Sequence, residues 1–464
     1  MNASGIYGES FMYDLIIIGG GPAGYLAGER AGAAGLKTLI AEKMFIGGVC
    51  LNEGCIPSKA LLYSAKLHDG AAHGQKYGVH VGKLVLDHGQ VIARKRKVVD
   101  ALTGGIRAKL KKLGVDIIEG EGKVLGRSGE GFSVSAGGKT VTGKRLLIAT
   151  GSVPSTPPIP GLKESLESGF ALTNREVLEL TEVPKELVVI GGGVIGLEMA
   201  SYYNSAGSSV TVIEMLDHIA GATDAEISDI LRKNYQAKGI NFKLSAKVTA
   251  IKGGAVEYEQ GGKALSAKAD KVLVSIGRRP ATDGIGLDTV GVYLERGAVK
   301  TDERMRTNVA GIYAAGDVNG MSMLAHTAYR EAEVAVSDML GIKDAMSYDA
   351  IPAVIYTNPE VASVGLTEEQ AKARGIDVKT VKLSMRYSGR YVAENEGGDG
   401  IIKLVADAAN ETVVGVHVIG NMSSEFIMSA VIMVEKRMRI AEIKRLVFPH
   451  PTVAEAIREA IFEL

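Results

Sequence analysis

The sequence predicts an α/β protein with two Rossmann-like dinucleotide-binding domains, followed by a C-terminal domain of the α+β class. One pattern of strand, glycine-rich turn, helix and strand occurs near the N-terminus and recurs 172 residues later. From about residue 347 onward, runs typical of strands and then of helices replace it. Glycine supplies 59 of the 464 residues and proline only 12, so the glycines are expected to serve local backbone geometry and not a low-complexity chain.

The first copy of the motif reads Gly19-x-Gly21-x-x-Gly24 and follows an apolar run. Helix-forming residues come next, and the run 37–42 has the composition of a second strand that ends in Glu42. Glycines at this spacing let the backbone approach a pyrophosphate at a helix N-terminus, and the acid accepts hydrogen bonds from ribose hydroxyls. This context favours a nucleotide site over a plain tight turn.

The second copy reads Gly191-x-Gly193-x-x-Gly196, and its second strand ends in Glu214. In both copies the acid follows the third glycine by 18 residues. Two separate dinucleotide sites are therefore predicted. Glu214 favours NAD over NADP, because a carboxylate pairs with a free 2′-hydroxyl and repels a 2′-phosphate, and no Lys or Arg occurs at positions 214–222.

The remaining segments complete the pattern. Apolar spacing predicts a helix over 89–113, and its basic cluster at 94–97 is expected to be a solvated face and not a nucleic-acid site. Further strands are predicted at 145–151, 271–278, 309–317, 401–405 and 413–418. Helices are predicted from Ser424 and near Ala454.

Composition excludes several classes of protein. Lys plus Arg and Asp plus Glu both number 53, and a formal net charge of zero argues against binding to nucleic acid or a membrane surface. No apolar run approaches the ~20 residues that span a bilayer. Residues 1–11 lack a basic segment and an apolar run, so no secretory signal is expected there. We therefore expect a cytoplasmic location.

The two cysteines, Cys50 and Cys55, lie just after the first motif. A zinc site is disfavoured, because no second cysteine pair or histidine cluster is near. In an ideal helix, Cα atoms five residues apart are separated by roughly 8–9 Å, and a disulfide needs less than about 7 Å. The backbone must therefore be distorted, which Gly54 and Pro57 permit. A strained, accessible disulfide suits thiol–disulfide exchange, and the nearby cation of Lys59 would lower a thiol pKa or polarise a cofactor.

The segment 47–59 closely resembles the redox-active segment of the class I flavin-dependent pyridine nucleotide–disulfide oxidoreductases. Its Cys-Ile-Pro-Ser-Lys ending is similar to that of the dihydrolipoamide dehydrogenase (E3) family. The similarity covers almost the whole chain and includes the runs 316–326, 356–365 and 450–455.

The resemblance implies a homodimeric flavoprotein that uses FAD and NAD and no metal. It would oxidise dihydrolipoamide carried on a lipoyl-bearing partner protein and reduce NAD, as the E3 component of 2-oxoacid dehydrogenase or glycine cleavage complexes. The implied FAD-binding domain covers 1–150 and 280–347, the NAD-binding domain 151–279, and the interface or dimerisation domain 348–464. Because about ten residues precede the first strand, no lipoyl domain is expected in the chain itself.

The resemblance also implies roles for individual residues. Cys55 would touch the flavin and Cys50 would exchange with substrate. Lys59 would pair with Glu198 beside the flavin. The FAD site would comprise Gly19, Gly21, Gly24, Glu42, Lys59, Gly122, Gly151, Asp317 and Ala325. The NAD site would comprise Gly191, Gly193, Gly196, Glu214 and Gly277.

The implied acid–base is His450, oriented by Glu455 and acting on the cysteines of the other subunit. Histidine is the natural base at neutral pH for a thiol that must lose its proton before exchange. The other histidines are expected to have ordinary roles: His326 a positional one, and His417 that of a packed core residue.

Several features depart from the family pattern. Glu53 stands between the cysteines, where an apolar residue is usual, and its negative charge is expected to raise the thiol pKa. Phe448 replaces a histidine that usually precedes His450, so packing near His450 is expected to differ. The short tail after Glu455 is expected to trim the interface or the site where a partner's lipoyl arm enters.

Two other functions remain open. The first is an NAD(P)H-dependent reductase of another disulfide or of mercuric ion, which Glu214 and the lack of a C-terminal cysteine pair disfavour. The second is a noncatalytic redox-sensing subunit, which the presence of Cys50, His450 and Glu455 disfavours.

Overall fold

A computed structural model describes residues 12–398 and 400–464, and the expectation about a secretory signal in 1–11 lies outside them. The described chain divides into two compact units. The first unit comprises residues 12–57, 93–155 and 277–347, and the second comprises 58–92, 156–276 and 348–464. Residues 58–92, which the sequence placed in the FAD-binding part, group with the second unit.

The first unit is built on a sheet of order β3-β2-β1-β6-β5-β4, with β19 paired to β6. Strands β3, β2, β1, β6 and β19 are parallel, while β4, β5 and β6 form antiparallel pairs. The strands are β1 (Met12–Ile18), β2 (Thr38–Glu42), β3 (Asp116–Glu119), β4 (Gly122–Ser128), β5 (Gly131–Ala136), β6 (Lys139–Ile148), β7 (Ser152–Pro154), β16 (Arg278–Pro280), β17 (Leu294–Glu295), β18 (Ala298–Val299) and β19 (Ile312–Ala314).

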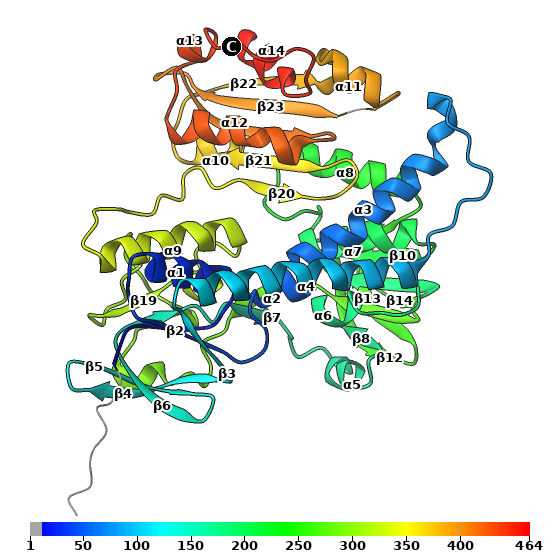
Figure 1. Cartoon of the computed structure of the whole chain (residues 1–464). Helices are drawn as coiled ribbons and strands as arrows, with labels where there is room; N and C mark the ends of the chain where they lie inside the picture. The colour runs from blue at the N-terminus through cyan, green and yellow to red at the C-terminus, as the bar shows by residue number, and fades with distance from the viewer. Residues whose placement is uncertain (1–11, 399) are drawn as a thin grey trace, which may run out of the picture. The chain divides into compact units, whose positions relative to one another are not determined.

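Helix α1 (Pro22–Ala33) connects β1 to β2 and lies beside α9 (Ala325–Met339), as Figure 1 shows. Buried Ile and Leu side chains of β1, β2 and β6 form the core beneath them, since strands of a parallel sheet are covered on both faces. The other helices of this unit are α2 (Gly48–Glu53) and the 3₁₀ turns η2 (Leu287–Val290) and η3 (Asp317–Asn319).

Two helices cross from one unit to the other along the chain, α3 (Cys55–Ala72) and α4 (His88–Lys112). The predicted helix over 89–113 is therefore present. The prediction that its basic cluster is solvated is confirmed for Arg94, Arg96 and Lys97, which are exposed. It is wrong for Lys95, whose side chain is buried with 1% exposed. Helical spacing places one of four consecutive residues on the inner face of such a helix, and here that residue is a lysine.

The second unit repeats the parallel design in a sheet of order β11-β10-β9-β15-β8. Helix α7 (Val194–Ser205) connects β9 to β10, and a three-stranded antiparallel sheet, β12-β13-β14, follows. The elements are α5 (Leu162–Glu167), β8 (Ala171–Leu172), α6 (Asn174–Val177), β9 (Glu186–Ile190), β10 (Ser209–Ile213), α8 (Ala225–Ala237), β11 (Asn241–Lys243), β12 (Ala246–Lys252), β13 (Ala255–Gln260), β14 (Lys263–Lys268) and β15 (Lys271–Val274), with the 3₁₀ turn η1 (Gly74–Tyr77) from the segment 58–92.

Residues from 348 onward form the predicted α+β domain within the second unit. Its antiparallel sheet has the order β20-β21-β24-β23-β22, and α12 packs on β21 and β24 while α14 packs on β22 and β23. The elements are β20 (Ala353–Ile355), β21 (Val361–Gly365), α10 (Glu368–Ala373), β22 (Val378–Ser384), η4 (Met385–Tyr387), α11 (Gly389–Glu394), β23 (Ile401–Asp407), β24 (Thr412–Ile419), α12 (Ser423–Glu435), α13 (Ile440–Ile443) and α14 (Glu455–Phe462).

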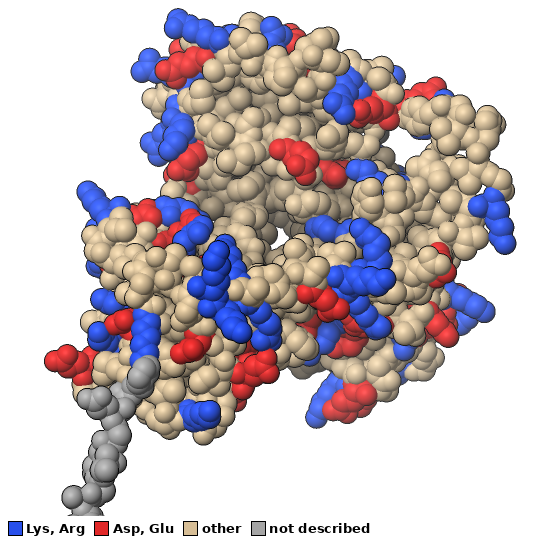
Figure 2. All heavy atoms as spheres, in the orientation of Figure 1, with Lys and Arg blue, Asp and Glu red and all other residues tan. Residues whose placement is uncertain are grey.

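Surface charge follows the balanced composition. Figure 2 shows Lys and Arg interspersed with Asp and Glu over the visible face. Among the described residues, no helix combines the length and the apolar content needed to cross a membrane.

Candidate functional site

The first and third glycines of each motif are required by the fold itself. Gly19 has φ +103°, and a Cβ at Gly24 would lie 1.9 Å from the Gly19 carbonyl oxygen. In the second copy Gly191 has φ +104°, and a Cβ at Gly196 would lie 2.3 Å from the Gly191 oxygen. The turn therefore brings the helix onto the end of the strand so closely that no larger side chain fits.

The middle glycines have no such internal reason. Gly21 and Gly193 precede α1 and α7 with φ −72° and −77°, which any residue adopts. A Cβ on Gly193 would meet no atom within 4 Å, and on Gly21 only the Gly48 Cα at 3.8 Å. The open space in front of each helix N-terminus fits a pyrophosphate, which a side chain at this position would obstruct.

The two predicted ribose-binding acids are held in the same way. Glu42 Oε2 accepts the N–H of Gly20 at 2.6 Å, and its Oε1 accepts the N–H of Met44 at 2.6 Å. Glu214 repeats this with the N–H groups of Gly192 at 2.6 Å and Leu216 at 2.8 Å. Each carboxylate is thus anchored beside its glycine turn.

Asp317 stands at the start of η3 and belongs to a relay in the first unit. Ser152 Oγ donates to Asp317 Oδ2 at 2.5 Å and accepts from Arg278 Nε at 2.7 Å. Burial lowers the pKa of Arg278, while Asp317, Glu53 and Cys55 oppose that shift, so these anionic groups lie within electrostatic range of the guanidinium. Asp317 is therefore held in place by Ser152, which lies on β7, far from it in the sequence.

The other residues that the sequence predicts for cofactor binding occupy positions set by local geometry. Gly151 comes shortly after β6 and Gly277 shortly after β15, and their φ angles are +71° and +102°. A Cβ at Gly122 would lie 2.9 Å from Ile18, so packing already requires glycine there. Ala325 begins α9.

The cysteine segment has the distortion that its spacing predicts. Helix α2 carries Cys50 and ends at Glu53. The next residue, Gly54, has φ −151° and ψ −106°, and α3 begins at Cys55. Both thiols are half-buried. Pro57 sits in the first turn of α3, where its missing N–H is tolerated.

Lys59 and Glu198 form an ion pair within the second unit. Lys59 Nζ lies 3.0 and 2.9 Å from the two carboxylate oxygens of Glu198, which is only 4% exposed. The Tyr356 N–H donates to Glu198 Oε1 at 3.1 Å, and the Tyr356 ring lies 4.2 Å from Lys59 Nζ. The carboxylate is therefore compensated in its buried position, which holds the lysine head in one place.

His450 and Glu455 also meet. His450 Nδ1 lies 2.8 Å from Glu455 Oε1, and the Thr452 N–H donates to Glu455 Oε2 at 2.8 Å. These two hydrogen bonds, that of Thr452 first, lower the pKa of Glu455. Because a carboxylate only accepts, the proton is on Nδ1, and Nε2 of the exposed ring is left as the basic atom.

The remaining expectations are met in part. His417 is 3% exposed and pairs through Nε2 with the Leu366 carbonyl, which confirms a packed core histidine. His326 is exposed. Phe448 packs against the core of the C-terminal domain, beside Ile432 and Met433.

Sequence reasoning missed three supporting residues: Ser152, Arg278 and Tyr356. Arg278 directly follows Gly277, but a single arginine after a glycine carries no pattern. Ser152 and Tyr356 act through contacts with residues 126 and 158 positions away in the chain. No local period or spacing announces such contacts.

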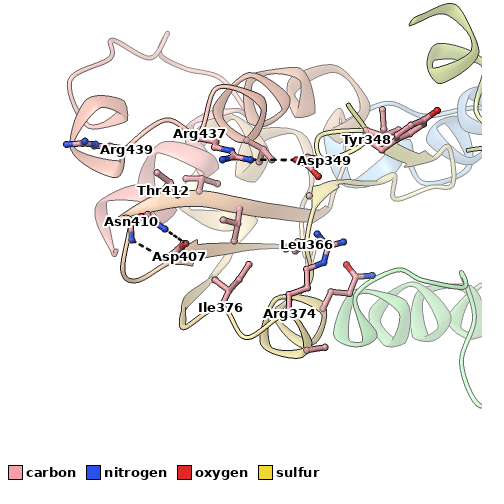
Figure 3. Close-up of a pocket in the computed structure, with 17 residues that line it drawn as sticks. Tyr348, Asp349, Leu366, Arg374, Ile376, Asp407, Asn410, Thr412, Arg437 and Arg439 are labelled. Atoms are coloured by element: carbon pink, nitrogen blue, oxygen red, sulfur yellow. Dashed lines mark hydrogen bonds and ion pairs between the residues drawn. The ribbon is translucent and has the colours of Figure 1, made fainter. Parts of the chain in front are cut away.

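The pocket in Figure 3 lies elsewhere. It has a volume of about 900 Å³ in the C-terminal domain and is lined by 17 described residues, none of which the sequence predicted for catalysis or cofactor binding. Arg437 pairs with Asp349 across it, and Asn410 pairs with Asp407 at its edge.

Comparison with known proteins agrees with this geometry over both parts of the chain. Residues 13–332 match the family described as pyridine nucleotide-disulphide oxidoreductase, and residues 351–461 match the dimerisation domain of that family.

Individual relatives span nearly the full length. A dihydrolipoyl dehydrogenase of Mycoplasma pneumoniae is 39% identical over 97% of this chain and 99% of its own. A dihydrolipoamide dehydrogenase of Chaetomium thermophilum is 41% identical over 96% and 90%.

Two solved structures share the fold. LpdA from Mycobacterium tuberculosis has a TM-score of 0.87 at 27% identity, and the HOCl-induced flavoprotein disulfide reductase RclA from Escherichia coli has 0.85 at 26%. Both comparisons cover 97% of this chain and 99% of the other. With two glycine motifs, a cysteine pair beside the first of them and both family domains, this chain belongs to the pyridine nucleotide-disulphide oxidoreductase family.

Proposed function

We propose that this oxidoreductase is a dihydrolipoyl dehydrogenase that oxidises a protein-bound dihydrolipoyl group and reduces NAD through a reversible Cys50–Cys55 disulfide. One observation carries the proposal most directly. The Gly47 N–H donates to the Gly20 carbonyl at 2.8 Å, so α2 with Cys50 starts on the first glycine turn. The cysteines therefore lie beside the place where the first dinucleotide, FAD, would bind. The full-length relatives named dihydrolipoyl dehydrogenase support the same activity.

The family's cofactors are FAD and NAD, which when bound supply the electron and hydride transfer. The open cradles at Gly21 and Gly193 fit their pyrophosphates. Glu42 and Glu214 would hold the two riboses, and the carboxylate at 214 supports NAD over NADP. Asp317, Gly122, Gly151 and Ala325 would complete the first site and Gly277 the second.

The chain's own residues would conduct the thiol half of the reaction. A thiolate of the substrate attacks the disulfide at Cys50, which releases Cys55 as a thiolate. The second substrate thiol then attacks the mixed disulfide, so the substrate leaves as a disulfide and both cysteines remain reduced. His450 would accept the substrate proton on Nε2, with Glu455 holding the ring by Nδ1. Lys59, fixed by Glu198, would supply positive charge beside the flavin.

The family's dimerisation domain supports a homodimer. We propose that His450 of each subunit serves the cysteines of the other, and that the lipoyl group arrives on a partner protein of a multienzyme complex in the cytoplasm. The proposed domains are FAD-binding over 1–150 and 280–347, NAD-binding over 151–279 and interface over 348–464.

The test is absorbance of reduced nicotinamide after mixing the purified flavoprotein, dihydrolipoamide and NAD⁺ without oxygen, with NADP⁺ in parallel. Rapid NADH formation, far slower reaction with NADP⁺ and loss of turnover in Cys50→Ser are expected. No turnover from a flavin-loaded dimer would refute the assignment. Equal rates with NADP⁺ would remove the role given to Glu214.

A further inference from the structure

A buried ion pair joins the C-terminal domain to the start of helix α8 within the second unit. Lys403 on β23 places its Nζ 2.7 Å from Asp224 Oδ2, and the two side chains are only 10% and 1% exposed. Burial lowers the pKa of Lys403, but the hydrogen bond to Asp224 and the charge of that residue outweigh it, so the pKa is raised. The lysine therefore keeps its charge inside the fold, and removing it would leave a buried carboxylate without compensation.

Asp224 is also the N-cap of α8. Its Oδ1 accepts the N–H groups of Glu226 and Ile227 at 3.1 and 3.2 Å. One carboxylate oxygen thus satisfies the first turn of the helix while the other binds Lys403. The helix itself packs against β24 of the C-terminal domain (Figure 1). The start of α8 is therefore tied to the C-terminal sheet.

The loop 215–223 connects the predicted NAD-binding acid to α8, and α8 holds it in place. Ser228 on α8 donates from Oγ to the Ile219 carbonyl at 2.8 Å. The next residue, Ala220, donates its N–H to the Gly192 carbonyl at 2.8 Å. Ile219 is 1% exposed, and a Cβ built on Gly192 would lie 3.3 Å from its side chain. The loop is therefore packed on the second glycine turn and fastened to α8.

A second ion pair connects the same two elements at the surface. Lys382 on β22 is the register partner of Lys403, and its Nζ lies 2.8 Å from Glu226 Oε1. These two side chains are 53% and 40% exposed. An exposed pair contributes little to stability, so Lys382 offers a matched control for the buried lysine.

We propose that Lys403 is a positioning residue for the NAD site: its pairing with Asp224 holds α8, and α8 holds the loop 215–223 against the second glycine turn. Lys403 lies on the C-terminal sheet and acts only through Asp224. This inference rests on the proposed function, since it assumes that the second glycine motif binds NAD.

The direction of the effect follows from the buried charge. Without the ammonium of Lys403, the carboxylate of Asp224 takes up a proton or moves toward water, and either change disturbs the N-cap of α8. The loop then loses its fixed position on the glycine turn, and NAD must restore that position when it binds. Affinity for NAD therefore falls. The first glycine motif and the cysteines lie in the first unit and are not touched by this change.

The test compares Lys403→Met with the unchanged protein, both as full-length flavoprotein. Methionine removes the charge and keeps an extended side chain. We expect the dissociation constant of NAD⁺, measured by isothermal titration, and the KM for NAD⁺ to rise about tenfold, within the range of about 5–150-fold that is typical of coupling between separate sites. Flavin content should be unchanged. The rate at which dihydrolipoamide reduces the enzyme without NAD⁺, measured by stopped-flow absorbance, should be unchanged too.

Three further variants separate positioning from general damage. Lys403→Met/Asp224→Asn removes the charge that the single variant leaves unpaired and keeps an N-cap side chain, so it should recover most of the NAD⁺ affinity. Ser228→Ala breaks only the hydrogen bond between α8 and Ile219 and should weaken NAD⁺ binding about threefold to tenfold. It decides the question where Lys403→Met yields no folded flavoprotein. Lys382→Met removes the exposed cation and should leave NAD⁺ affinity unchanged.

The outcomes distinguish this inference from the proposed function. Unchanged NAD⁺ affinity in folded Lys403→Met would overturn the role of Lys403, and unchanged affinity in Ser228→Ala would do so if Lys403→Met does not fold. An equal loss of NAD⁺ affinity, flavin content and dithiol oxidation would overturn it too, because that is the mark of general damage. An effect of Lys382→Met as large as that of Lys403→Met would have the same meaning. Failure of the unchanged protein to bind NAD⁺ would overturn the proposed function instead.

Discussion

Replacing the middle glycine of the second motif with alanine should separate cofactor binding from folding. In Gly193→Ala the new Cβ meets no protein atom within 4 Å, and the backbone φ of −77° suits alanine. Losing glycine at a helix N-cap costs less than about 1 kcal/mol, and the stiffer unfolded chain offsets about 0.4–1 kcal/mol of that. The net change in the free energy of unfolding should therefore stay within about 0.5 kcal/mol.

The binding of NAD should respond quite differently. The methyl group occupies the space through which the backbone would reach a pyrophosphate, so we expect affinity to fall between tenfold and a hundredfold, about 1.4–2.8 kcal/mol. Flavin content should be unchanged, because the first motif is untouched. Isothermal titration of NAD into the flavoprotein measures the affinity, and the denaturant midpoint measures the stability.

Gly196→Ala is the matched control with the opposite profile. Its Cβ would lie 2.3 Å from the Gly191 carbonyl oxygen and 2.5 Å from Ser275 Oγ, so the backbone must shift. Overpacking of this kind costs about 1–3 kcal/mol. Unchanged NAD affinity in Gly193→Ala, or full stability in Gly196→Ala, would refute the assignment of binding to the middle glycine and packing to the third.

Other variants test the remaining parts of the site. Glu455→Ala removes the acceptor that orients His450, so turnover should fall about 10–100-fold with little change in KM for dihydrolipoamide, measured by steady-state kinetics; an unchanged kcat would remove the orienting role. Lys59→Met leaves the buried Glu198 without its cation, and since the lysine is partly exposed the loss of unfolding free energy should be about 2–3 kcal/mol by denaturant titration. Lys59→Met/Glu198→Leu should recover most of that loss, and no recovery would contradict the pairing. Burial lowers the pKa of His417, so near neutral and acid pH the unfolded chain binds a proton that the folded chain does not bind. The free energy of unfolding should therefore decline as pH falls below 6.5. His417→Gln should flatten that decline in denaturant midpoints measured from pH 5 to 8.

The sequence predicts well whatever depends on local spacing. Two glycine motifs, their terminal acids and the break between Cys50 and Cys55 are all consequences of residues within a few turns of one another. The structure places that break at Gly54, one of the two residues that permit it. The hydrogen bond between His450 and Glu455 is predictable for the same reason, because the two residues are only five positions apart.

Long-range contacts and burial are what the sequence leaves out. Arg278 reaches Ser152 over 126 positions, and no pattern in either segment signals the other. The burial of Lys95 was missed for a similar reason. Four consecutive basic residues predict a solvated helix face, and only the packing of the helix decides that one of them points inward. In physical terms, hydrophobic periodicity fixes which face of an element is buried, whereas the partner of a polar group depends on the whole fold.

The repeated motif also explains how one scaffold comes to hold two different cofactors. In the first copy the Gly47 N–H bonds to the Gly20 carbonyl, and in the second the Ala220 N–H bonds to the Gly192 carbonyl, both at 2.8 Å. Glycine turn, acid and closing loop are therefore equivalent in the two copies, and none of them distinguishes a flavin from a nicotinamide. The two copies diverge in function after this closing contact. After Gly47 the chain enters α2 and the cysteines, whereas after Ala220 it leads to α8 without a redox-active residue. Because electrons must pass from a dithiol to a cofactor within contact distance, we infer that the cysteines, and not the glycine motif, assign the flavin to the first copy.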